Sequence, residues 1–456
     1  MDDERDAEGN RFASRARRYA KVTGAVGGMA LREAGRRITG TEADYAKIAG
    51  ELRRALGGLK GPLMKVAQIL ATVPDAVPEE FAKELATLQS QAPAMGWVFV
   101  RRRMSAELGP DWRGRFAEFA QEAVGAASLG QVHRAVAPDG TALAVKLQYP
   151  DMLSAVEADL KQLKLALSIH KRMDGVIDTA EIYEEISDRL REELDYTREA
   201  AHMRLYGAVL ADQPDIHVPR HFPALSSRRL LAMSWLDGTP ILDWKGAAEE
   251  VRNRLADVLF RAWWLPFTRI GVIHGDPHLG NYTVAGEGAG INLLDYGCVR
   301  IFPAAFVAGV IELYRALETG DEARAVHAYE TWGFTNLSTD LIETLNIWAR
   351  FIYGPMLDDR PRTIADGIAP AEYGRREMTE VHRRLKALGP LRPPREFVFM
   401  DRAAIGLGAV FLHLGATRNW CEMFNAALDG FDPALITARQ QAALDAAGIP
   451  GAAASA

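Results

Sequence analysis

The spacing of apolar residues changes in character along the first half of the chain. Residues 42–92 follow a helical period, with an apolar face formed by Leu63, Met64, Ala67, Ile69 and Leu70. After Trp112 the period becomes two, and short apolar runs alternate with turns that contain glycine or proline as far as Leu147. This pattern predicts a strand, a loop, a strand, a turn and a third strand. Residues 155–206 then return to a helical period with many charges, which predicts long helices.

The second half of the chain is predicted to be mainly helical. Glu249 to Ile270 forms one helical pattern, and its bulky apolar residues are assigned to the core: Trp263, Trp264 and Phe267. Residues 303–446 are helical in pattern, with breaks near 354–360 and 389–394. Ala403 to Thr417 contains no Asp, Glu, Lys or Arg, but its fifteen residues fall short of the roughly 18 that a membrane-spanning helix needs. We therefore expect a buried helix there and no membrane span.

Between these helical regions, Ile273 to Arg300 carries the residues best suited to chemistry. Asp276 and Asn281 are five positions apart, and Asp295 follows fourteen positions after Asn281 within an Asp-Tyr-Gly sequence. This order is close to that of protein kinases, in which a catalytic Asp and an Asn four residues later precede an Asp-Phe-Gly element. Mg²⁺ prefers oxygen ligands, so Asn281 and Asp295 are candidate metal ligands and Asp276 is the candidate catalytic residue. The alternative is a surface loop in which these residues form turns.

A second candidate element lies in the predicted strands further upstream. Gly125 and Gly130 match the outer glycines of the kinase phosphate-binding loop, but Ala127 occupies the place of the middle glycine. A side-chain methyl at that place should hinder the closest approach of the backbone to a phosphate. Lys146 follows Ala144-Val145 on the next strand but one, as a phosphate-binding lysine does in kinases. Lys146 is therefore a candidate for ATP binding and catalysis.

Two further segments supply candidate partners for this lysine and for a nucleotide. The sequence from Glu193 to Glu199 contains several carboxylates that could pair with Lys146, although acidic runs most often form a solvated face. Glu193 and Glu199 are six positions apart, so on one helix they would face different sides. Arg229 to Leu236 is an apolar extended run that suits the strand and hinge beside an adenine, where Met233 and Trp235 are candidate contacts.

The composition indicates a globular protein that contains one large or two modest domains. Of the 456 residues, 48% are hydrophobic and 25% are charged, and the net charge of −6 gives no basic field for nucleic acid. Cys298 and Cys421 are too far apart in sequence to form a metal-binding motif, which favours a reduced, cytoplasmic protein. The first residues are acidic and no apolar run follows them, so no secretory signal is expected.

The N-terminal region allows two interpretations. Arg11 to Arg37 contains eight basic residues and one acidic residue around a small apolar centre. Such a segment suits a helix at the inner face of a membrane, which would make the protein peripheral. A solvated terminal helix is the alternative, because Gly24, Gly27 and Gly28 weaken a helix.

These elements together resemble the UbiB/AarF family of atypical kinase-like proteins, which is linked to ubiquinone biosynthesis and isoprenoid-lipid homeostasis. The resemblance runs from about Gly57 to Trp420. The Lys-x-Gly-Gln motif of the family's N-terminal extension is matched by Lys65 to Gln68, with Ala67 in place of the glycine. Its alanine-rich phosphate loop resembles the segment that consists of Ala126, Ala127, Ser128, Leu129, Gly130 and Gln131.

The resemblance also suggests roles for the charged residues. The family's ATP lysine falls on Lys146, and the helix glutamate that pairs with it falls on Glu199. The Glu-x-Asp motif falls on Glu193 and Asp195, which are expected to meet Lys65 of the extension. The catalytic-loop residues of the family fall on Asp276 and Asn281, and its metal aspartate falls on Asp295. Ser234 departs from the family, in which an acidic hinge residue is common.

The resemblance implies an α+β, atypical protein-kinase-like fold of two lobes that is mostly helical and has a helical N-terminal extension over the active site. The expected divisions are a basic N-terminus at 1–40, the extension at 41–111, an N-lobe at 112–236, a helical C-lobe at 237–446 and a loose tail at 447–456. Only five residues separate Gly297 from Pro303, so the sequence leaves no room for a long activation segment. Protein kinase activity is therefore not expected.

The function implied is that of an ATP-dependent and Mg²⁺-dependent ATPase or lipid-directed kinase in ubiquinone or isoprenoid-lipid metabolism. One alternative is a nucleotide-gated pseudokinase that binds lipid or a partner, which the alanine loop favours. The other is a small-molecule phosphotransferase, because His274-Gly275-Asp276 with Asn281 also resembles aminoglycoside and choline kinases. The expected partners are ATP and an isoprenoid lipid or membrane surface, and the sequence leaves open a homodimer or a biosynthetic complex.

Overall fold

The computed structural model describes residues 95–126, 129–150, 152–157, 160–161, 164, 179–368, 374–388 and 394–450. The chain divides into two compact units. The second unit is formed by Gly96–Val124, Val132–Leu147 and the chain from Asp195 onward, and the first unit holds the remaining described residues. The predicted positions Lys65, Gln68, Ala127 and Ser128 lie outside the described residues, as do the predicted segment 1–40, most of 41–111 and the end of the predicted tail.

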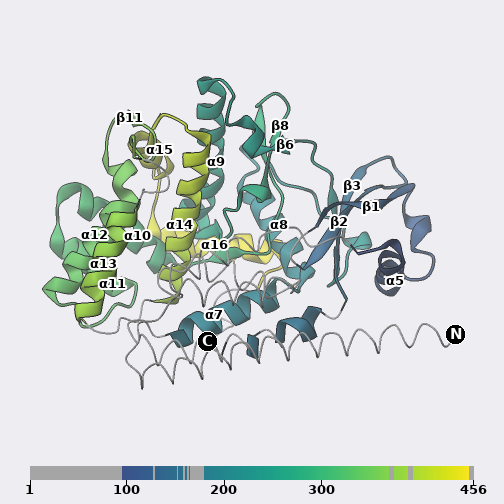
Figure 1. Ribbon diagram of the computed structural model, residues 1–456, viewed down its shortest axis with the longest axis horizontal. Coiled ribbons are helices and arrows are strands. Elements are labelled where there is room, and N and C mark those ends of the chain that lie inside the picture. The colour runs from purple at the N-terminus through teal and green to yellow at the C-terminus, as the bar shows by residue number, and fades with distance from the viewer. Residues whose placement is uncertain are drawn as a thin grey trace, which may run out of the picture. The chain divides into compact units, whose positions relative to one another are not determined.

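A four-stranded sheet forms the N-terminal part of the second unit. Its order is β1 (Glu118–Ala126), β2 (Gly130–Val136), β3 (Ala142–Gln148) and β5 (Leu230–Ser234). Side chains on one face of β3 pack with α5 (Trp97–Leu108) and the short helix η1 (Trp112–Arg115), which lie beside the sheet in Figure 1. On the other face, Ala144 joins a much larger core. Lys146 is two positions further along β3 and therefore shares the face of Ala144.

The predicted strand–loop–strand–turn–strand pattern is present, with two differences in its bounds. Strand β1 starts at Glu118 and continues through Gly125 to Ala126, where the sequence pattern predicted a loop. The turn between β2 and β3 contains Gly140 at φ +85°, which a residue with a side chain rarely adopts. The predicted strand at Arg229–Leu236 is β5, which pairs antiparallel with β3 and places Leu231 opposite Lys146.

The predicted long helices at 155–206 are interrupted between Glu192 and Tyr196, where the charge pattern predicts one continuous helix. Helix α7 (Thr179–Glu192) ends before Glu193, and α8 (Tyr196–Val209) begins after Asp195. Asp195 caps α8, because its side chain accepts a hydrogen bond from the backbone N–H of Thr197 at 3.0 Å. The expectation that Glu193 and Glu199 occupy different sides of one helix was therefore wrong, since a helix break separates them.

Three smaller sheets follow in the described part of the second unit, and two of them contain strands of the predicted catalytic stretch. One has the order β4 (Ile216–His217), β9 (Gly290–Leu293), β8 (Tyr282–Ala285) and β6 (Thr239–Pro240). The other pairs β10 (Val299–Ile301) with β7 (Val272–His274). Short helical turns lie between strands in this part of the chain: η2 (Pro223–Leu225), η3 (Ile241–Trp244) and η4 (Leu279–Asn281). The sheets are small, but they contain the four strands of the predicted catalytic stretch, β7, β8, β9 and β10.

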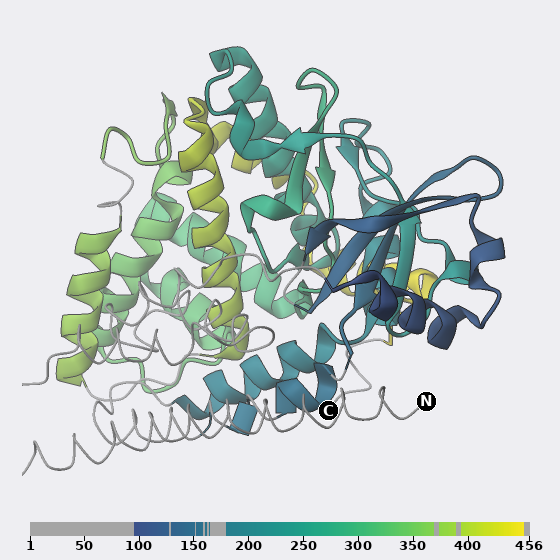
Figure 2. The ribbon, with the colours of Figure 1, turned by 45° about the vertical axis from the view of Figure 1, so that its right-hand side comes forward.

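Helices form the rest of the second unit and surround its main core. They are α9 (Glu249–Ile270), α10 (Ala304–Thr319), α11 (Glu322–Thr331), α12 (Thr339–Tyr353), α13 (Arg375–Leu388), α14 (Arg395–Leu414), α15 (Trp420–Ala427) and α16 (Pro433–Ala447). The remaining short elements are η5 (Gly354–Leu357), β11 (Pro361–Arg362) and β12 (Arg418–Asn419). Figures 1 and 2 show α14 running beside α9, with α10 to α13 grouped next to them.

The structure confirms the predicted helix over Glu249–Ile270, and its three aromatic residues are buried in the core. The predicted buried helix at 403–417 is part of α14, which begins earlier and ends at Leu414, before Gly415 at φ +59°. Only one side of this helix is fully buried, with Ala403, Leu407 and Val410 in the core. In the described part of the chain, no helix is both long enough and apolar enough to span a bilayer.

Candidate functional site

The centre of the candidate site is a buried ion cluster around Lys146. The Nζ atom of Lys146 donates to both carboxylate oxygens of Glu199, at 2.7 and 2.9 Å, and to Oδ2 of Asp295 at 3.0 Å. Lys146 and Glu199 are only 8% and 3% exposed. Strand β3 supplies the lysine and the first turn of α8 supplies the glutamate, so the alternation of β3 and the cap of α8 together fix this contact. Of the carboxylates between Glu193 and Glu199 that could pair with this lysine, Glu199 is in contact with it.

The charges of this cluster do not balance, because one ammonium group faces two carboxylates. Burial by itself lowers the pKa of Lys146, but the charges of Asp295 and Glu199 outweigh burial and raise this pKa well above its ordinary value. Burial raises the pKa of Glu199 to about 7, against the opposing effect of Lys146. The cluster therefore holds excess negative charge, and it would be stabilised by an additional cation close to Asp295.

Pairing between β8 and β9 places the two candidate metal ligands next to each other. Tyr282 lies opposite Leu293, and one residue further the backbone N–H of Leu294 donates to the carbonyl oxygen of Asn281 at 3.0 Å. Asp295 follows directly. The side-chain amide of Asn281 donates from Nδ2 to the carbonyl oxygen of Asp276 at 3.0 Å, which orients the amide and leaves its oxygen available as a ligand. Oδ1 of Asp295 accepts from the backbone N–H of Gly297 at 2.9 Å.

Asp276 is held by the backbone that precedes it. The backbone N–H of Gly275 donates to the carbonyl oxygen of Cys298 at 3.0 Å, which continues the pairing of β7 with β10. A Cβ atom added to Gly275 would lie 2.4 Å from that carbonyl oxygen, so only glycine fits. The glycine at this position, where protein kinases have an arginine, is thus explained by the close approach of two strands.

Residues at this site can provide part of the coordination of Mg²⁺. The described residues contain no group of three or more His, Cys, Asp or Glu side chains that could hold a metal ion without further ligands. Asp295 and Asn281 supply a carboxylate oxygen and an amide oxygen, and the Asp295 side chain is 33% exposed. This donor set fits Mg²⁺ in phosphoryl-transfer sites, where substrate phosphates and water complete the coordination.

Two histidines position the Asp295-Tyr296-Gly297 segment: His274, which belongs to the predicted His-Gly-Asp element, and His202, which the sequence does not single out. Nδ1 of His274 accepts from the backbone N–H of Asp276 at 3.4 Å, so Nε2 carries the proton and donates to the carbonyl oxygen of Asp295. His202 in α8 contacts the next carbonyl, with Nδ1 at 3.1 Å from the oxygen of Tyr296. Both histidines are buried. His274 could have been recognised from its place two residues before Asp276, whereas the sequence around His202 gives no comparable signal.

The predicted hinge residues occupy the end of β5. Met233 is buried and lies opposite Ala144 of β3, and the backbone N–H of Trp235 donates to the carbonyl oxygen of Ala142 at 2.9 Å. The indole N–H of Trp235 donates to Asp237 at 2.7 Å. Ser234, which departs from the family pattern, accepts from the backbone N–H of Arg220 at 2.8 Å through its hydroxyl oxygen. Contact of Met233 and Trp235 with an adenine stays a prediction.

The remaining predicted site residues that the structure describes are Ala126, Leu129, Gly130, Glu193 and Asp195. Leu129 and Gly130 of the predicted phosphate loop are buried in the first unit, where the carbonyl oxygen of Leu129 accepts from the backbone N–H of Tyr149 at 3.0 Å. Ala126 ends β1. Asp195 caps α8 and lies 3.4 Å from Nε of Arg228, and Glu193 follows α7. The predicted meeting of Lys65 with Glu193 and Asp195 stays a prediction.

Comparison with known proteins identifies the family. The model of the ABC1 atypical kinase-like domain matches residues 87–329, more than half of the chain. Among curated relatives, "Atypical kinase COQ8, mitochondrial" of Saccharomyces cerevisiae is 29% identical over 250 residues, which cover 55% of this chain and 50% of that protein. "Atypical kinase COQ8B, mitochondrial" of Rattus norvegicus is 27% identical over 316 residues, with coverage of 69% and 59%. "AarF domain-containing protein kinase 1" of Xenopus laevis is 30% identical over 272 residues, with coverage of 58% and 52%.

The matched part of the chain spans about half of the length of these relatives. A solved structure, the complex of Rv3197 with erythromycin from Mycobacterium tuberculosis, has 25% sequence identity and a TM-score of 0.57. The alignment covers 89% of this chain and 99% of that one. The fold is therefore the predicted atypical kinase-like fold, a mixed α+β arrangement dominated by helices. The match of the domain model and the names of these relatives together show that the chain belongs to the ABC1 atypical kinase-like family, also called UbiB/AarF.

Proposed function

We propose that this chain binds Mg-ATP and acts on its terminal phosphate, as an ATPase or as a kinase directed at a lipid. The observation that carries the proposal is the contact of Lys146 with Glu199 and Asp295, at 2.7 and 3.0 Å. In kinases a lysine on the equivalent strand pairs with a helix glutamate and contacts the nucleotide phosphates. Lys146 and Glu199 are buried, and the cost of desolvation makes such a pair weak evidence for a role in stability, whereas charged groups with shifted pKa values cluster at functional sites.

Each residue of the cluster has a role in this proposal. Lys146 binds the phosphates and Glu199 holds its ammonium group in place. Asn281 and Asp295 hold Mg²⁺, which when bound neutralises charge on the phosphate oxygens. Asp276 orients the attacking oxygen of water or of an acceptor hydroxyl, or accepts its proton. The hydrogen bond from Asn281 to the backbone of Asp276, at 3.0 Å, links the residue that handles the attacking oxygen to a metal ligand.

We propose that this activity supports the metabolism of ubiquinone or of another isoprenoid lipid. The proposal rests on the resemblance to the UbiB/AarF family and on similarity to relatives named COQ8. Contact with lipid would be made at a membrane surface. A nucleotide-gated protein without turnover is the other candidate, since the alanine-rich loop departs from the kinase pattern. The complete set of charged residues around Lys146 favours turnover.

The test is release of ADP from Mg-ATP by the purified full chain, measured with and without liposomes that contain anionic lipids. We expect turnover that rises with liposomes and that falls by about 100-fold or more in the Asp295→Asn variant, which is the scale of loss when one preorganised polar group is removed from a site. The matched control is Asp243→Asn, an exposed aspartate in η3. It should leave turnover unchanged.

Binding of nucleotide is measured in the same preparations, so that loss of affinity and loss of chemistry are separated. If wild type binds Mg-ATP but turns it over no faster than Asp276→Asn does, the nucleotide-gated proposal replaces the enzymatic one. Equal turnover in wild type and Asp295→Asn would show that the metal site has been assigned wrongly.

A further inference from the structure

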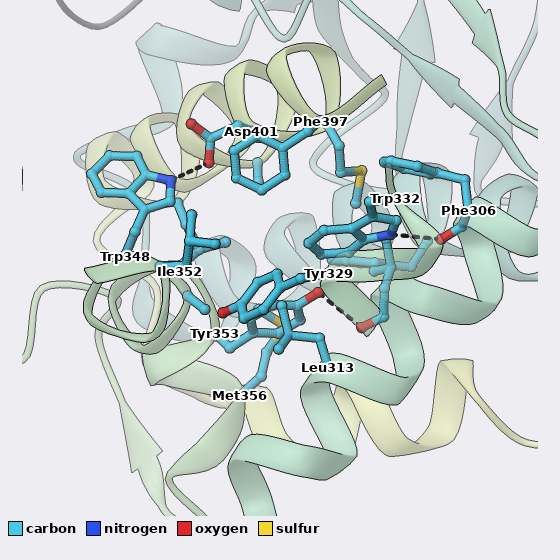
Figure 3. A pocket seen from close by; sticks show the side chains of 16 residues that line it. Phe306, Leu313, Tyr329, Trp332, Trp348, Ile352, Tyr353, Met356, Phe397 and Asp401 are labelled. Carbon is cyan, nitrogen blue, oxygen red and sulfur yellow. Dashed lines mark hydrogen bonds between the residues drawn. The ribbon is translucent and has the colours of Figure 1, made fainter. Parts of the chain in front are cut away.

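A cavity of about 50 Å³ lies among the C-terminal helices of the second unit, within the helix group that α9, α10, α11, α12 and α14 form. Figure 3 shows the 16 side chains that line it. Val310, Tyr329 and Tyr353 are buried, whereas Ile352 of α12 and Met400 of α14 are half-buried. The side of the cavity nearest to solvent is therefore the edge where α12 meets α14. None of the residues assigned to Mg-ATP lines this cavity.

Aromatic side chains make up much of the lining, and four of their five polar groups donate hydrogen bonds within the protein. The aromatic members are Trp264, Phe306, Tyr329, Trp332, Trp348, Tyr353 and Phe397. The indole N–H of Trp332 donates to the carbonyl oxygen of Phe306 at 3.2 Å, and the hydroxyl of Tyr353 donates to the carbonyl oxygen of Val310 at 2.9 Å. The hydroxyl of Tyr329 donates to Asn346 at 2.9 Å. The walls therefore present mainly apolar ring surface.

The one charged side chain of the lining is Asp401 of α14. Figure 3 shows its carboxyl group between Trp348 and Phe397, and the indole N–H of Trp348 donates to Oδ1 at 2.6 Å. Within the part of the chain that the structure describes, no lysine, arginine or histidine forms an ion pair with Asp401, and Oδ2 accepts no hydrogen bond. Burial raises the pKa of Asp401 to about 7, the response of a carboxyl group placed among apolar groups without a cation.

Neither water nor a purely apolar ligand matches this lining well. The volume corresponds to roughly three to five water molecules, but each buried water needs two to four polar partners, and the lining offers mainly one carboxyl group. A purely apolar occupant would gain nothing from that carboxyl group, whose ionised form only a cation would stabilise. Aromatic rings grouped around a carboxylate are the arrangement that attracts an organic cation, because ring faces are electronegative and the carboxylate supplies the opposite charge.

We propose that this cavity is a binding site for a small organic cation, an ammonium group that carries short apolar substituents and lies against the rings with its charge towards Asp401. The site is distinct from the Lys146 cluster, so its test does not depend on ATP turnover. The ammonium group gains the counter-charge, and the substituents fill the space that water occupies poorly.

The experiment compares two probes of the same number of heavy atoms on the purified full chain. Tetramethylammonium chloride carries the charge, and tert-butanol is neutral. Saturation-transfer NMR detects binding and calorimetric titration at constant ionic strength measures Kd. We expect saturable 1:1 binding of tetramethylammonium and at least roughly tenfold weaker binding of tert-butanol, because only the cation interacts with the carboxylate and the ring quadrupoles.

Variants locate the site. Asp401→Asn keeps the shape of the side chain and an acceptor for Trp348. It should raise the Kd of tetramethylammonium by roughly tenfold or more and leave the Kd of tert-butanol unchanged. Ala404→Leu adds volume at the half-buried edge of the lining and should reduce binding of both probes. The control Asp429→Asn alters an exposed aspartate between α15 and α16 and should change neither. Circular dichroism verifies that each variant is folded.

Several outcomes would overturn the proposal. If wild type shows no saturable binding of tetramethylammonium, the cavity is not a cation site. Equal affinity for both probes would remove the role of charge. Binding that survives both Asp401→Asn and Ala404→Leu would place the cation elsewhere on the molecule. The comparison of the two probes on wild type decides the first two questions even if a variant fails to fold.

Discussion

At the level of single residues, the candidate site is organised by the surplus of negative charge around one lysine. Lys146 contacts both Glu199 and Asp295, and the more buried of these two carboxylates has its pKa raised to about 7 by burial. A group that titrates so close to neutral pH should make the behaviour of the protein depend on pH. Activity and stability respond to this titration in opposite directions.

We predict that kcat/KM for Mg-ATP falls as pH decreases below about 7, because protonation of Glu199 removes the charge that holds Lys146. Glu199→Gln should be less active by roughly tenfold at neutral pH and should lack this acidic limb. The pKa of Glu199 is higher in the folded chain than its ordinary value of 4.5, so its contribution to stability is fully present below pH 4.5 and is lost as pH rises through about 7. The melting temperature of Glu199→Gln relative to wild type should therefore rise over this interval.

The control for this prediction is Glu287→Gln, an exposed glutamate between β8 and β9. It should reproduce the wild-type profiles of activity and stability. An acidic limb that persists unchanged in Glu199→Gln would show that another group controls it.

The candidate phosphate-binding and metal-binding residues of this site could be predicted from sequence, but His202, which positions the loop that carries Asp295, could not. Lys146, Asn281 and Asp295 stand in a recognisable order, since phosphoryl transfer requires particular charged groups and metal ligands at particular places along the chain. His202 contacts the carbonyl oxygen of Tyr296, which is 94 positions away. Nothing in the sequence around a single buried histidine indicates such a partner, because the contact depends on how α8 packs against the loop.

At the level of elements, strong hydrophobic periodicity predicted whether a helix or a strand forms better than it predicted the residues at which the element begins and ends. Helix α9 has the predicted bounds, because a long amphipathic pattern ends at Gly271, whose φ of +67° closes the helix. The break between α7 and α8 was missed, since the pattern of charges continues through it and only the cap by Asp195 marks it. The contact of α14 with the catalytic loop was also beyond prediction, because it joins segments more than 100 residues apart.

That contact gives a prediction for α14. A Cβ atom on Gly406 would lie 2.1 Å from Cγ of Pro277, the residue that follows Asp276, so Gly406→Ala must displace either the helix or the loop. We expect kcat to fall by about tenfold to 100-fold, because small displacements of a catalytic group are costly to the rate. The matched control is Gly408→Ala on the same helix, where an added Cβ meets nothing within 4 Å.

Gly408→Ala should leave kcat unchanged and increase stability by about 0.5–1 kcal/mol, the difference between alanine and glycine inside a helix. Steady-state kinetics and thermal melting of both variants provide the measurement. The contact would have no role in catalysis if Gly406→Ala and Gly408→Ala showed the same kcat.

At the level of the whole second unit, the described buried hydrophobic residues form one large and one small cluster. The larger cluster joins α8, α9, α10, α14, α15 and α16 with one face of the N-terminal sheet. The smaller cluster lies on the other face of that sheet, with Met104 of α5 and Trp112 among its members. Alternation along β3 assigns Val145 to the smaller cluster and Ala144 to the larger one. The sheet that carries Lys146 therefore depends on both clusters.

The smaller cluster should set the local stability of the sheet, and this can be tested with Met104→Ala. Met104 is fully buried, so its truncation should cost about 2–5 kcal/mol. Hydrogen exchange, followed by mass spectrometry, should become faster in α5 and β1 to β3 while the amides of α9 keep their wild-type protection. The control in the same helix is Val98→Ala, because Val98 is 55% exposed and contributes little to the cluster.

Mg-ATP connects this local effect to function. If the nucleotide binds Lys146 on the sheet, Mg-ATP at 100 times its Kd should raise the free energy of unfolding of Met104→Ala by about 2.7 kcal/mol. Hydrogen exchange in β3 of this variant should then become slower. The same addition to a Lys146→Met variant should restore nothing, since the residue that couples nucleotide to the sheet is missing. Protection of β3 by Mg-ATP that is equal with and without Lys146 would mean that the nucleotide is held elsewhere. Loss of protection in α9 of Met104→Ala would mean instead that the two clusters unfold as one.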